Sequence, residues 1–393
     1  MITDGVALLD QHCHGVRTED LDRANFEANL GEGRRGHIDS ALGLAVRRFC
    51  APVLDLEAHA SADDYLARRA ELGWREASTR LLRGAGVTTW LIDSGFWPEP
   101  DAAQHDTTLS RARNSGRHPL RDNAAPITAP HTDKLAAFGA LAGTVGEVVR
   151  LEQVAEQVIA ERRHSPLLFA EIENTLRERA NDAVGFKTVA AYRCGLHFPS
   201  VEFPPSTIPA DHRITDPELI GWLVGLGARL GAELGLPLQI HTGFGDPDLR
   251  LDHADPLLLT DFLRATADTG LTVVLLHCWP FHRNAAYLAH LFDHVHLDLG
   301  LTIPHVGARA GAVLAETLEL APFGALGYSS DGFALPELHY LAALLWRRGL
   351  GRLLDDWLAE DLITTVDAEA MVTAIASGNA RRIYPVDRVR VAG

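Results

Sequence analysis

Short hydrophobic runs bounded by turn residues alternate along the chain with longer segments of helical composition. We predict that eight of these runs are strands: Val6–His12, Val87–Asp93, Gly146–Leu151, Val184–Val189, Pro237–His241, Leu271–His277, Val295–Leu299 and Ala325–Asp331. Most are separated by segments rich in Ala, Leu, Glu and Arg, which we expect to be helices: Glu76–Arg83, Gln153–Arg162, Pro217–Leu234, Leu257–Thr269 and Arg309–Leu320. This repeated alternation predicts an α/β fold, a closed (β/α)8 TIM barrel.

The chain is longer than a minimal barrel. It has 393 residues, whereas such a barrel needs roughly 250, so we expect one domain over 1–393 that carries two insertions. The first, 16–74, follows strand one and contains predicted helices at Asp20–Asn29, Ile38–Phe49 and Ala62–Leu72. This insertion either shapes the pocket at the barrel mouth or is a solvent-exposed helical addition to the barrel. The second, 98–134, follows strand two, has no clear period and is expected to be a long loop, either an active-site flap or a partly disordered excursion.

Histidine, lysine and aspartate side chains fall at the ends of several predicted strands. The first run ends in His12 and His14, which point to the same face because strand side chains alternate. Further candidate ligands follow in later runs: Lys187, His241, His277 and Asp331. In a barrel of this kind, the carboxyl ends of the strands share one rim. Imidazole and carboxylate groups gathered there predict a site for a divalent metal, most simply zinc, with manganese or iron as alternatives.

The order of these residues resembles the amidohydrolase superfamily of metal-dependent hydrolases. Within it, the chain is most similar to the amidohydrolase-2 group and to the amidohydrolase part of FluG-like and nodulin-6-like proteins. Four stretches carry the resemblance: Gly185–Leu196, Ile240–Asp246, Leu276–Phe281 and Ser330–Glu337. The resemblance implies a metal-dependent amidohydrolase. Because such proteins are found fused or adjacent to glutamine-synthetase-like domains, it also implies a functional link to an enzyme of that kind and a γ-glutamyl amide as one candidate substrate.

A divalent ion in such a site lowers the pKa of a bound water to about 7, which makes a nucleophile available at neutral pH. Asp331 is the candidate proton shuttle to the leaving nitrogen, as its counterpart is in the resembling family. His277 or His241 would add a hydrogen bond to the developing oxyanion. The expected reaction is hydrolysis of a C–N bond in a small amide.

Lys187 leaves two alternatives open. An ammonium beside a dication is repelled, so the lysine must be neutral, turned away, or carboxylated on its side-chain nitrogen. Many members of the superfamily use the carboxylated form to bridge two metals, which would give ligands His12, His14, Lys187, His241, His277 and Asp331. Otherwise one ion is bound by His12, His14, His241 and Asp331, and Lys187 contacts substrate.

Residues for substrate binding are expected in the loops that follow the later strands. Arg193 directly follows Tyr192 after strand four, where a guanidinium can bind a carboxylate with two parallel hydrogen bonds. Asp246 lies in the loop after strand five and can bind an ammonium or hydroxyl group. Glu337 begins a helix beyond strand eight, at the rim, where it either contacts substrate or packs.

Other functions remain possible for the same barrel. The amidohydrolase-2 group also includes decarboxylases that release carbon dioxide without hydrolysis, and uronate isomerase chemistry is a third option. A further alternative is an inactive scaffold that partners a glutamine-synthetase-like ligase. Every predicted ligand position is filled by a competent residue, which favours an enzyme.

Composition narrows the range of partners. The formal net charge of −16, from 36 basic and 52 acidic side chains, disfavours nucleic acids and anionic membranes as partners. The four cysteines show no paired spacing, so we expect no disulfide. There is no leader-like segment and no apolar stretch of membrane-spanning length, so a cytoplasmic location is expected. We also expect a small-molecule substrate and a homo-oligomer.

Overall fold

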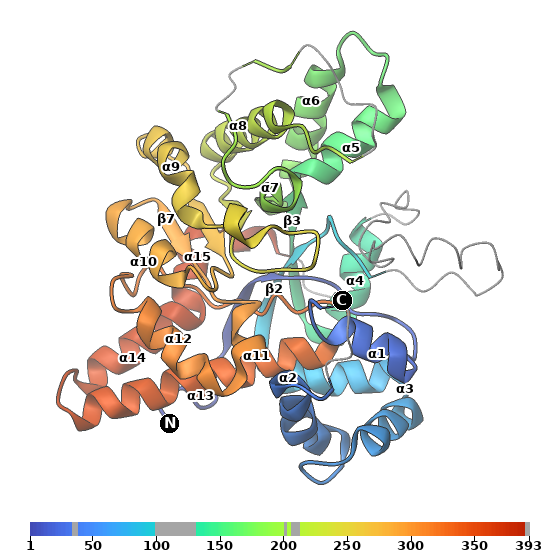
Figure 1. The fold of residues 1–393 in the computed structure, drawn as a ribbon, viewed down its shortest axis with the longest axis vertical. Helices are drawn as coiled ribbons and strands as arrows, with labels where there is room; N and C mark the ends of the chain where they lie inside the picture. Colours follow the sequence, from blue (N-terminus) through green and yellow to red (C-terminus); the bar gives the residue numbers. More distant parts are fainter. Residues whose placement is uncertain (34–37, 99–130, 200–202, 206–212, 390–393) are drawn as a thin grey trace.

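The computed structural model describes residues 1–33, 38–98, 131–199, 203–205 and 213–389 (Figure 1). Of the predicted loop insertion 98–134, residues 99–130 lie outside the described residues, so its role stays a prediction. None of the described helices is both long and apolar enough to cross a membrane.

Seven parallel strands follow one another around the sheet in the order of the chain. Their bounds are β1 (Leu8–Cys13), β2 (Val87–Asp93), β3 (Thr144–Arg150), β4 (Ala183–Thr188), β5 (Leu238–His241), β6 (Val273–Leu276) and β7 (Val295–Leu297). Each agrees with a predicted strand to within a few residues, and β2 has the predicted bounds. The fold is the α/β TIM barrel that the alternating pattern predicted.

The eighth predicted strand differs from the prediction. Residues 325–331 do not form a regular strand, although the backbone N–H of Leu297 on β7 donates to Ala325 O and the N–H of Gly327 donates to Leu297 O. On the other side, the N–H of Gln11 on β1 donates to Tyr328 O. The segment therefore bridges β7 and β1. Its extended path ends at Asp331, whose φ of 48° turns the backbone away from strand geometry.

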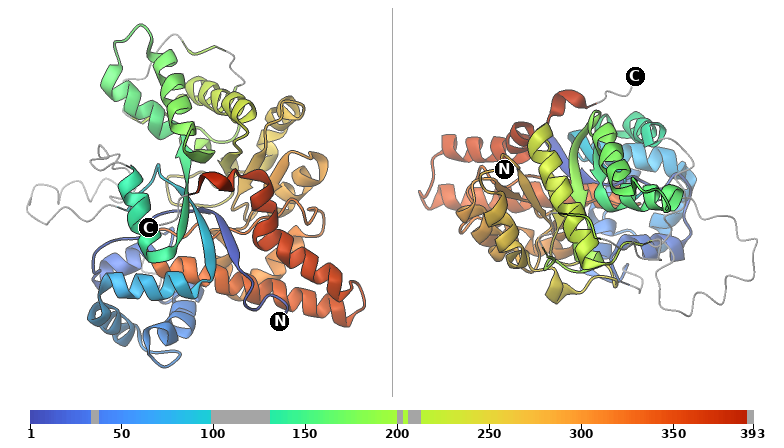
Figure 2. Two further views of the ribbon diagram at one scale, coloured as in Figure 1. Left: turned by 180° about the vertical axis from the view of Figure 1, so that it is seen from behind. Right: turned by 90° about the horizontal axis from the view of Figure 1, so that it is seen from above.

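Helices surround the sheet (Figures 1 and 2). Their bounds are α1 (Arg23–Leu30), α2 (Ala41–Ala45), α3 (Ala62–Gly84), α4 (His131–Ala142), α5 (Leu151–Arg162), α6 (Leu168–Ala180), α7 (Ala190–Arg193), α8 (Pro217–Leu234), α9 (Thr260–Thr266), α10 (His282–Leu291), α11 (Thr302–Val306), α12 (Ala310–Thr317), α13 (Pro336–Ala359), α14 (Thr365–Thr373) and α15 (Asn379–Ile383).

Local sequence signals explain where individual helices begin and end. The Asp216 side chain accepts a hydrogen bond from the N–H of Leu219 and Pro217 occupies the first turn of α8, which ends at Gly235 with a left-handed φ of 67°. Gly73, with a φ of 75°, interrupts α3. This kink separates the two helices that were predicted from Ala62 and from Glu76.

The barrel interior is filled by apolar side chains from most of its strands. Leu9, Leu91, Val148, Val184, Val274 and Leu276 pack with Ala380 and Tyr384 near the C-terminus. Figure 2 shows the chain around α15 crossing the barrel on the side that faces away in Figure 1. The interior is therefore a packed core, and chemistry is confined to the rim where the strands end.

Truncating the inner core should destabilise the protein strongly. Leu91→Ala removes a fully buried side chain and should lower the free energy of unfolding by about 2–5 kcal/mol, because it leaves a cavity between strands. Chemical denaturation followed by circular dichroism measures the change. Leu44→Ala, at a side chain that is 56% exposed on α2, is the matched control and should change stability by less than about 0.5 kcal/mol. Equal losses in the two variants would contradict this description of the core.

Candidate metal centre

The six predicted ligands come together at the carboxyl ends of the strands. Asp331 Oδ1 lies 3.1 Å from His12 Nε2 and 3.3 Å from His14 Nε2, and Asp331 Oδ2 lies 3.7 Å from His277 Nε2. Lys187 Nζ is 3.2 Å from His12 Nε2. The ring centroids of His241 and His277 are 4.7 Å apart. All of these side chains are buried or nearly so, which removes the competition of bulk water for their lone pairs.

Gln239 fixes the tautomer of His12. The side-chain amide of Gln239 donates from Nε2 to the carbonyl oxygen of Gln11 at 2.7 Å, so its Oε1 must be the atom that faces His12 Nδ1 at 2.8 Å. His12 therefore carries its proton on Nδ1. Burial and the nearby Lys187 charge lower the pKa of His12 to about 4, so the ring is neutral near pH 7. Its Nε2 lone pair points to the centre.

Asp331 presents a second unsatisfied acceptor to the same point. Its Oδ1 has no hydrogen-bond donor among the described residues, although it lies beside the bare Nε2 of His12. Burial opposes ionisation, but the neighbouring imidazoles of His277 and His14 lower the pKa of Asp331 well below its ordinary value. Two lone pairs 3.1 Å apart in a buried site repel unless a cation lies between them. The donor set therefore fits a divalent ion.

His241 and His277 differ in what their rings offer. His241 Nε2 is buried and has no hydrogen-bond partner among the described residues, and burial lowers the pKa of the ring. In contrast, His277 Nδ1 accepts the backbone N–H of Leu301 at 3.4 Å, which favours a proton on Nε2, the atom that faces Asp331. His241 is thus available as a ligand, whereas His277 is better placed as a hydrogen-bond donor.

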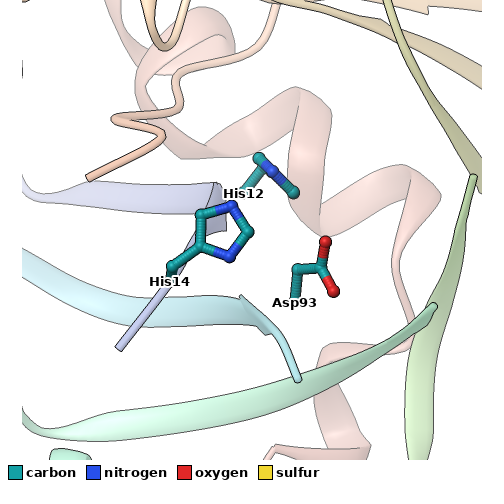
Figure 3. Close-up of side chains that lie close together, drawn as sticks. All are labelled: His12, His14 and Asp93. Carbon is teal, nitrogen blue, oxygen red and sulfur yellow. The ribbon is translucent and has the colours of Figure 1, made fainter. Parts of the chain in front are cut away.

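Asp93, at the end of β2, was missed by the sequence analysis. It lies beside His12 and His14, and one potential ligand atom from each of the three lies within 4.8 Å of the others (Figure 3). The signal was present, because Asp93 closes its hydrophobic run as His241 closes another. Its oxygens already accept bonds from Arg150 and from the N–H of Gly95. Asp331, with an unpartnered oxygen, is therefore the better carboxylate ligand.

Lys187 lies within the centre, in register with Arg150 on β3 and Gln239 on β5. Burial lowers the pKa of its amine to about 8, against the opposing effect of the Asp93 and Asp331 carboxylates. A lysine with so low a pKa loses its proton readily, which is the condition for either a neutral amine or a carbamate beside a cation.

The four predicted substrate residues have different surroundings. The Tyr192 ring packs on His241 with a centroid distance of 4.6 Å, beside the centre. Asp246 Oδ1 accepts the N–H of Asp248 within its own loop. The other two have buried or half-buried partners away from the six predicted ligands. Arg193 is paired with Glu156 of α5 at 3.0 Å, and Glu337 binds Arg69 and Tyr65 of α3 at 2.9 Å each.

This combination of a β/α barrel with buried imidazoles and a carboxylate at the strand ends is typical of metal-dependent hydrolases. Residues 197–386 match the sequence model of a family described as amidohydrolase. The chain is 32% identical to Protein fluG of Emericella nidulans over 224 residues, which cover 52% of this chain and 26% of that protein. The chain thus spans about a quarter of the length of this curated relative.

Solved structures with the same fold are also similar to this chain. A protein from Lactobacillus casei described as a metal-dependent hydrolase is 27% identical, with 98% of this chain and 97% of that chain covered and a TM-score of 0.77. Uronate isomerase from Thermotoga maritima is 13% identical, with 98% and 96% covered and a TM-score of 0.60, which shows a shared fold. Residues 197–386 thus carry the amidohydrolase family pattern, and the chain is similar to Protein fluG and, over the whole barrel, to a metal-dependent hydrolase.

Gln239→Met should weaken metal binding. Without the amide oxygen, His12 is no longer held in the tautomer that aims Nε2 at the centre, and loss of such a supporting bond typically costs about 10- to 100-fold in metal affinity. Competition with a chromophoric chelator measures the affinity. Gln157→Met, at an exposed position on α5, is the matched control. Equal affinity in the two variants would show that Gln239 does not orient a ligand.

Glu337→Gln should act on stability and leave substrate affinity unchanged. The substitution leaves the buried guanidinium of Arg69 without its counter-charge, which should lower the free energy of unfolding by about 3 kcal/mol. Glu76→Gln breaks an exposed pair with Arg80 on the same helix α3 and should cost less than about 1 kcal/mol. A raised KM with unchanged stability would contradict this assignment and would support the prediction that Glu337 binds substrate.

Proposed function

We propose that the protein hydrolyses the C–N bond of a small amide with the help of a divalent metal, zinc in the first instance and manganese or iron as alternatives. One observation carries the proposal: the unprotonated Nε2 of His12 and Asp331 Oδ1, which has no donor among the described residues, face each other across 3.1 Å in a buried site, with Lys187 Nζ 3.2 Å from the same Nε2. The match of residues 197–386 to the amidohydrolase family model and the similarity to a metal-dependent hydrolase support the same conclusion.

His12, His14 and Asp331 would hold the ion, with His241 as a further ligand through its unpartnered Nε2. When bound, a divalent ion lowers the pKa of water and polarises a carbonyl group. In the two-metal alternative, a carboxylated Lys187 would bridge the ions. In the one-metal alternative, Lys187 remains an amine and faces substrate.

Asp331 is suited to move the proton. Its Oδ1 faces His12 and His14, which leaves Oδ2 on the side of His277. An ionised carboxylate there can take a proton from the attacking water and return it to the leaving nitrogen. His277, with its proton on Nε2, can donate a hydrogen bond to the carbonyl oxygen as negative charge develops. His277 then acts through a hydrogen bond and Asp331 through proton transfer.

The substrate class is the finer part of the proposal. We propose a γ-glutamyl amide as the substrate, and with it a functional link to a glutamine-synthetase-like enzyme, on the strength of the sequence resemblance to FluG-like proteins. The test is to incubate metal-loaded protein with a panel of γ-glutamyl amides and other small amides, while amine and carbon dioxide are both measured. Amine release is expected. Carbon dioxide release from an acid panel without amine formation would identify a decarboxylase, and a lack of turnover on either panel would favour a scaffold role.

Asp331→Asn should lower turnover of the best amide by about 10²- to 10⁴-fold, because the amide side chain cannot accept the proton. Turnover is measured by amine release at saturating metal, and metal content is determined in parallel to separate loss of the shuttle from loss of the ion. Wild-type turnover in this variant would contradict the assignment of Asp331.

A further inference from the structure

Arg150 is a nearly buried cation at the rim that the proposed reaction does not use. It is the last residue of β3, and its Cα pairs in register with that of Lys187 on β4. Its side chain is only 13% exposed. A guanidinium is costly to bury, so its presence beside the metal ligands needs a chemical reason.

The ion pair with Asp93 explains only part of why a guanidinium is buried here. Arg150 donates from Nη2 at 2.6 Å and from Nε at 3.1 Å, both to Asp93 Oδ2. A guanidinium has five N–H donors arranged as a rigid fork. Nη1 makes no hydrogen bond within the described part of the chain. The edge of the fork formed by Nη1 and Nη2 can therefore bind a second carboxylate with two parallel bonds.

The surroundings hold the guanidinium in place. A Cβ atom at Gly95 would lie 2.3 Å from Arg150 Cβ, so only glycine permits this packing. The guanidinium lies over the Phe96 ring, with its carbon 5.7 Å from the ring centroid. Phe96 in turn stacks on Phe333, and both rings meet His14 edge-on. A pair of aromatic rings thus connects the ligand His14 with Arg150.

We propose that Arg150 binds a carboxylate group of the substrate, so that this centre selects anionic amides. The inference rests on the proposed amide hydrolysis for its reaction, but the recognition of a carboxylate stands on the geometry of Arg150. Asp93 orients the fork, and the Phe96 and Phe333 rings lie between Arg150 and the His14 imidazole. Arg193, which the sequence suggested for this task, is already paired with Glu156. Since the chain carries a net charge of −16, an anionic substrate requires such a local cation.

Two matched amides test the selection. N-methylglutaramate and N-methylbutanamide differ only in that the first has a terminal carboxylate where the second has hydrogen. For the wild-type protein loaded with metal, kcat/KM should be about 10- to 100-fold higher for the first, the gain expected for hydrogen bonds to a charged group. In Arg150→Met this ratio should fall to near one, and Arg150→Lys should give an intermediate ratio because it keeps the charge but loses the fork.

Control variants separate recognition from damage to the centre. Arg193→Met should keep the wild-type ratio. Because Arg150→Met leaves Asp93 without its counter-charge, the double variant Asp93→Asn/Arg150→Met is included, and it should also give a ratio near one. A wild-type ratio near one, or a ratio that survives both Arg150→Met and the double variant, would overturn the proposal.

Binding gives a readout that does not depend on turnover. Calorimetric titration of metal-loaded protein with glutarate and with butyrate compares a dicarboxylate with the monocarboxylate that has hydrogen in place of the second carboxylate. Glutarate should bind about tenfold more tightly to the wild type and no more tightly than butyrate to Arg150→Met. If this holds while no amide is hydrolysed, the proposed function fails and carboxylate recognition stands. If amides are hydrolysed but glutarate has no Arg150-dependent advantage, carboxylate recognition fails alone.

Discussion

The hydrogen bond between Gln239 and His12 sets the chemistry of the whole centre. It decides which nitrogen of His12 carries the proton and so aims a bare lone pair at a charged carboxylate, that of Asp331. Asp331 Oδ1 has no hydrogen-bond donor among the described residues, and the Lys187 amine lies 3.2 Å from His12 Nε2. A site that places two acceptors against each other inside a protein loses free energy unless a cation joins them. The proposed affinity for a metal ion follows from this unfavourable contact between two acceptors.

Two further aspartates, Asp10 and Asp298, hold the backbone that carries the candidate ligands. Asp10 Oδ1 accepts the N–H groups of His12 and Ser330, and thereby ties β1 to the segment that ends in Asp331. Burial raises the pKa of Asp10 to about 8. Asp298 accepts the N–H groups of His277 and Gly300, and also the side-chain amide of Gln11. Ligands from distant parts of the chain are in this way fixed to one another before any ion binds, which is the preorganisation that catalysis needs.

The fold could be predicted because short hydrophobic runs and segments of helical composition alternate along the sequence. The gathering of the candidate ligands at one rim could be predicted because each ends or lies within a hydrophobic run. Contacts between distant residues could not be foreseen: Arg193 pairs with Glu156 from another helix, and Glu337 pairs with Arg69 across the core. Asp93 could have been predicted in the same way as His241, because each is the polar residue that ends a hydrophobic run. The irregular backbone at Asp331 depends on tertiary hydrogen bonds that no local pattern encodes.

The fold alone does not select the reaction, since uronate isomerase from Thermotoga maritima shares it at 13% sequence identity. The claim on which the rest depends is that a cation joins His12 and Asp331. Crystals of the metal-loaded protein, measured at the absorption edge of the bound element, test it most directly. The account predicts an anomalous peak about 2.0–2.2 Å from both His12 Nε2 and a carboxylate oxygen of Asp331. A peak elsewhere, or none in fully loaded protein, would contradict it.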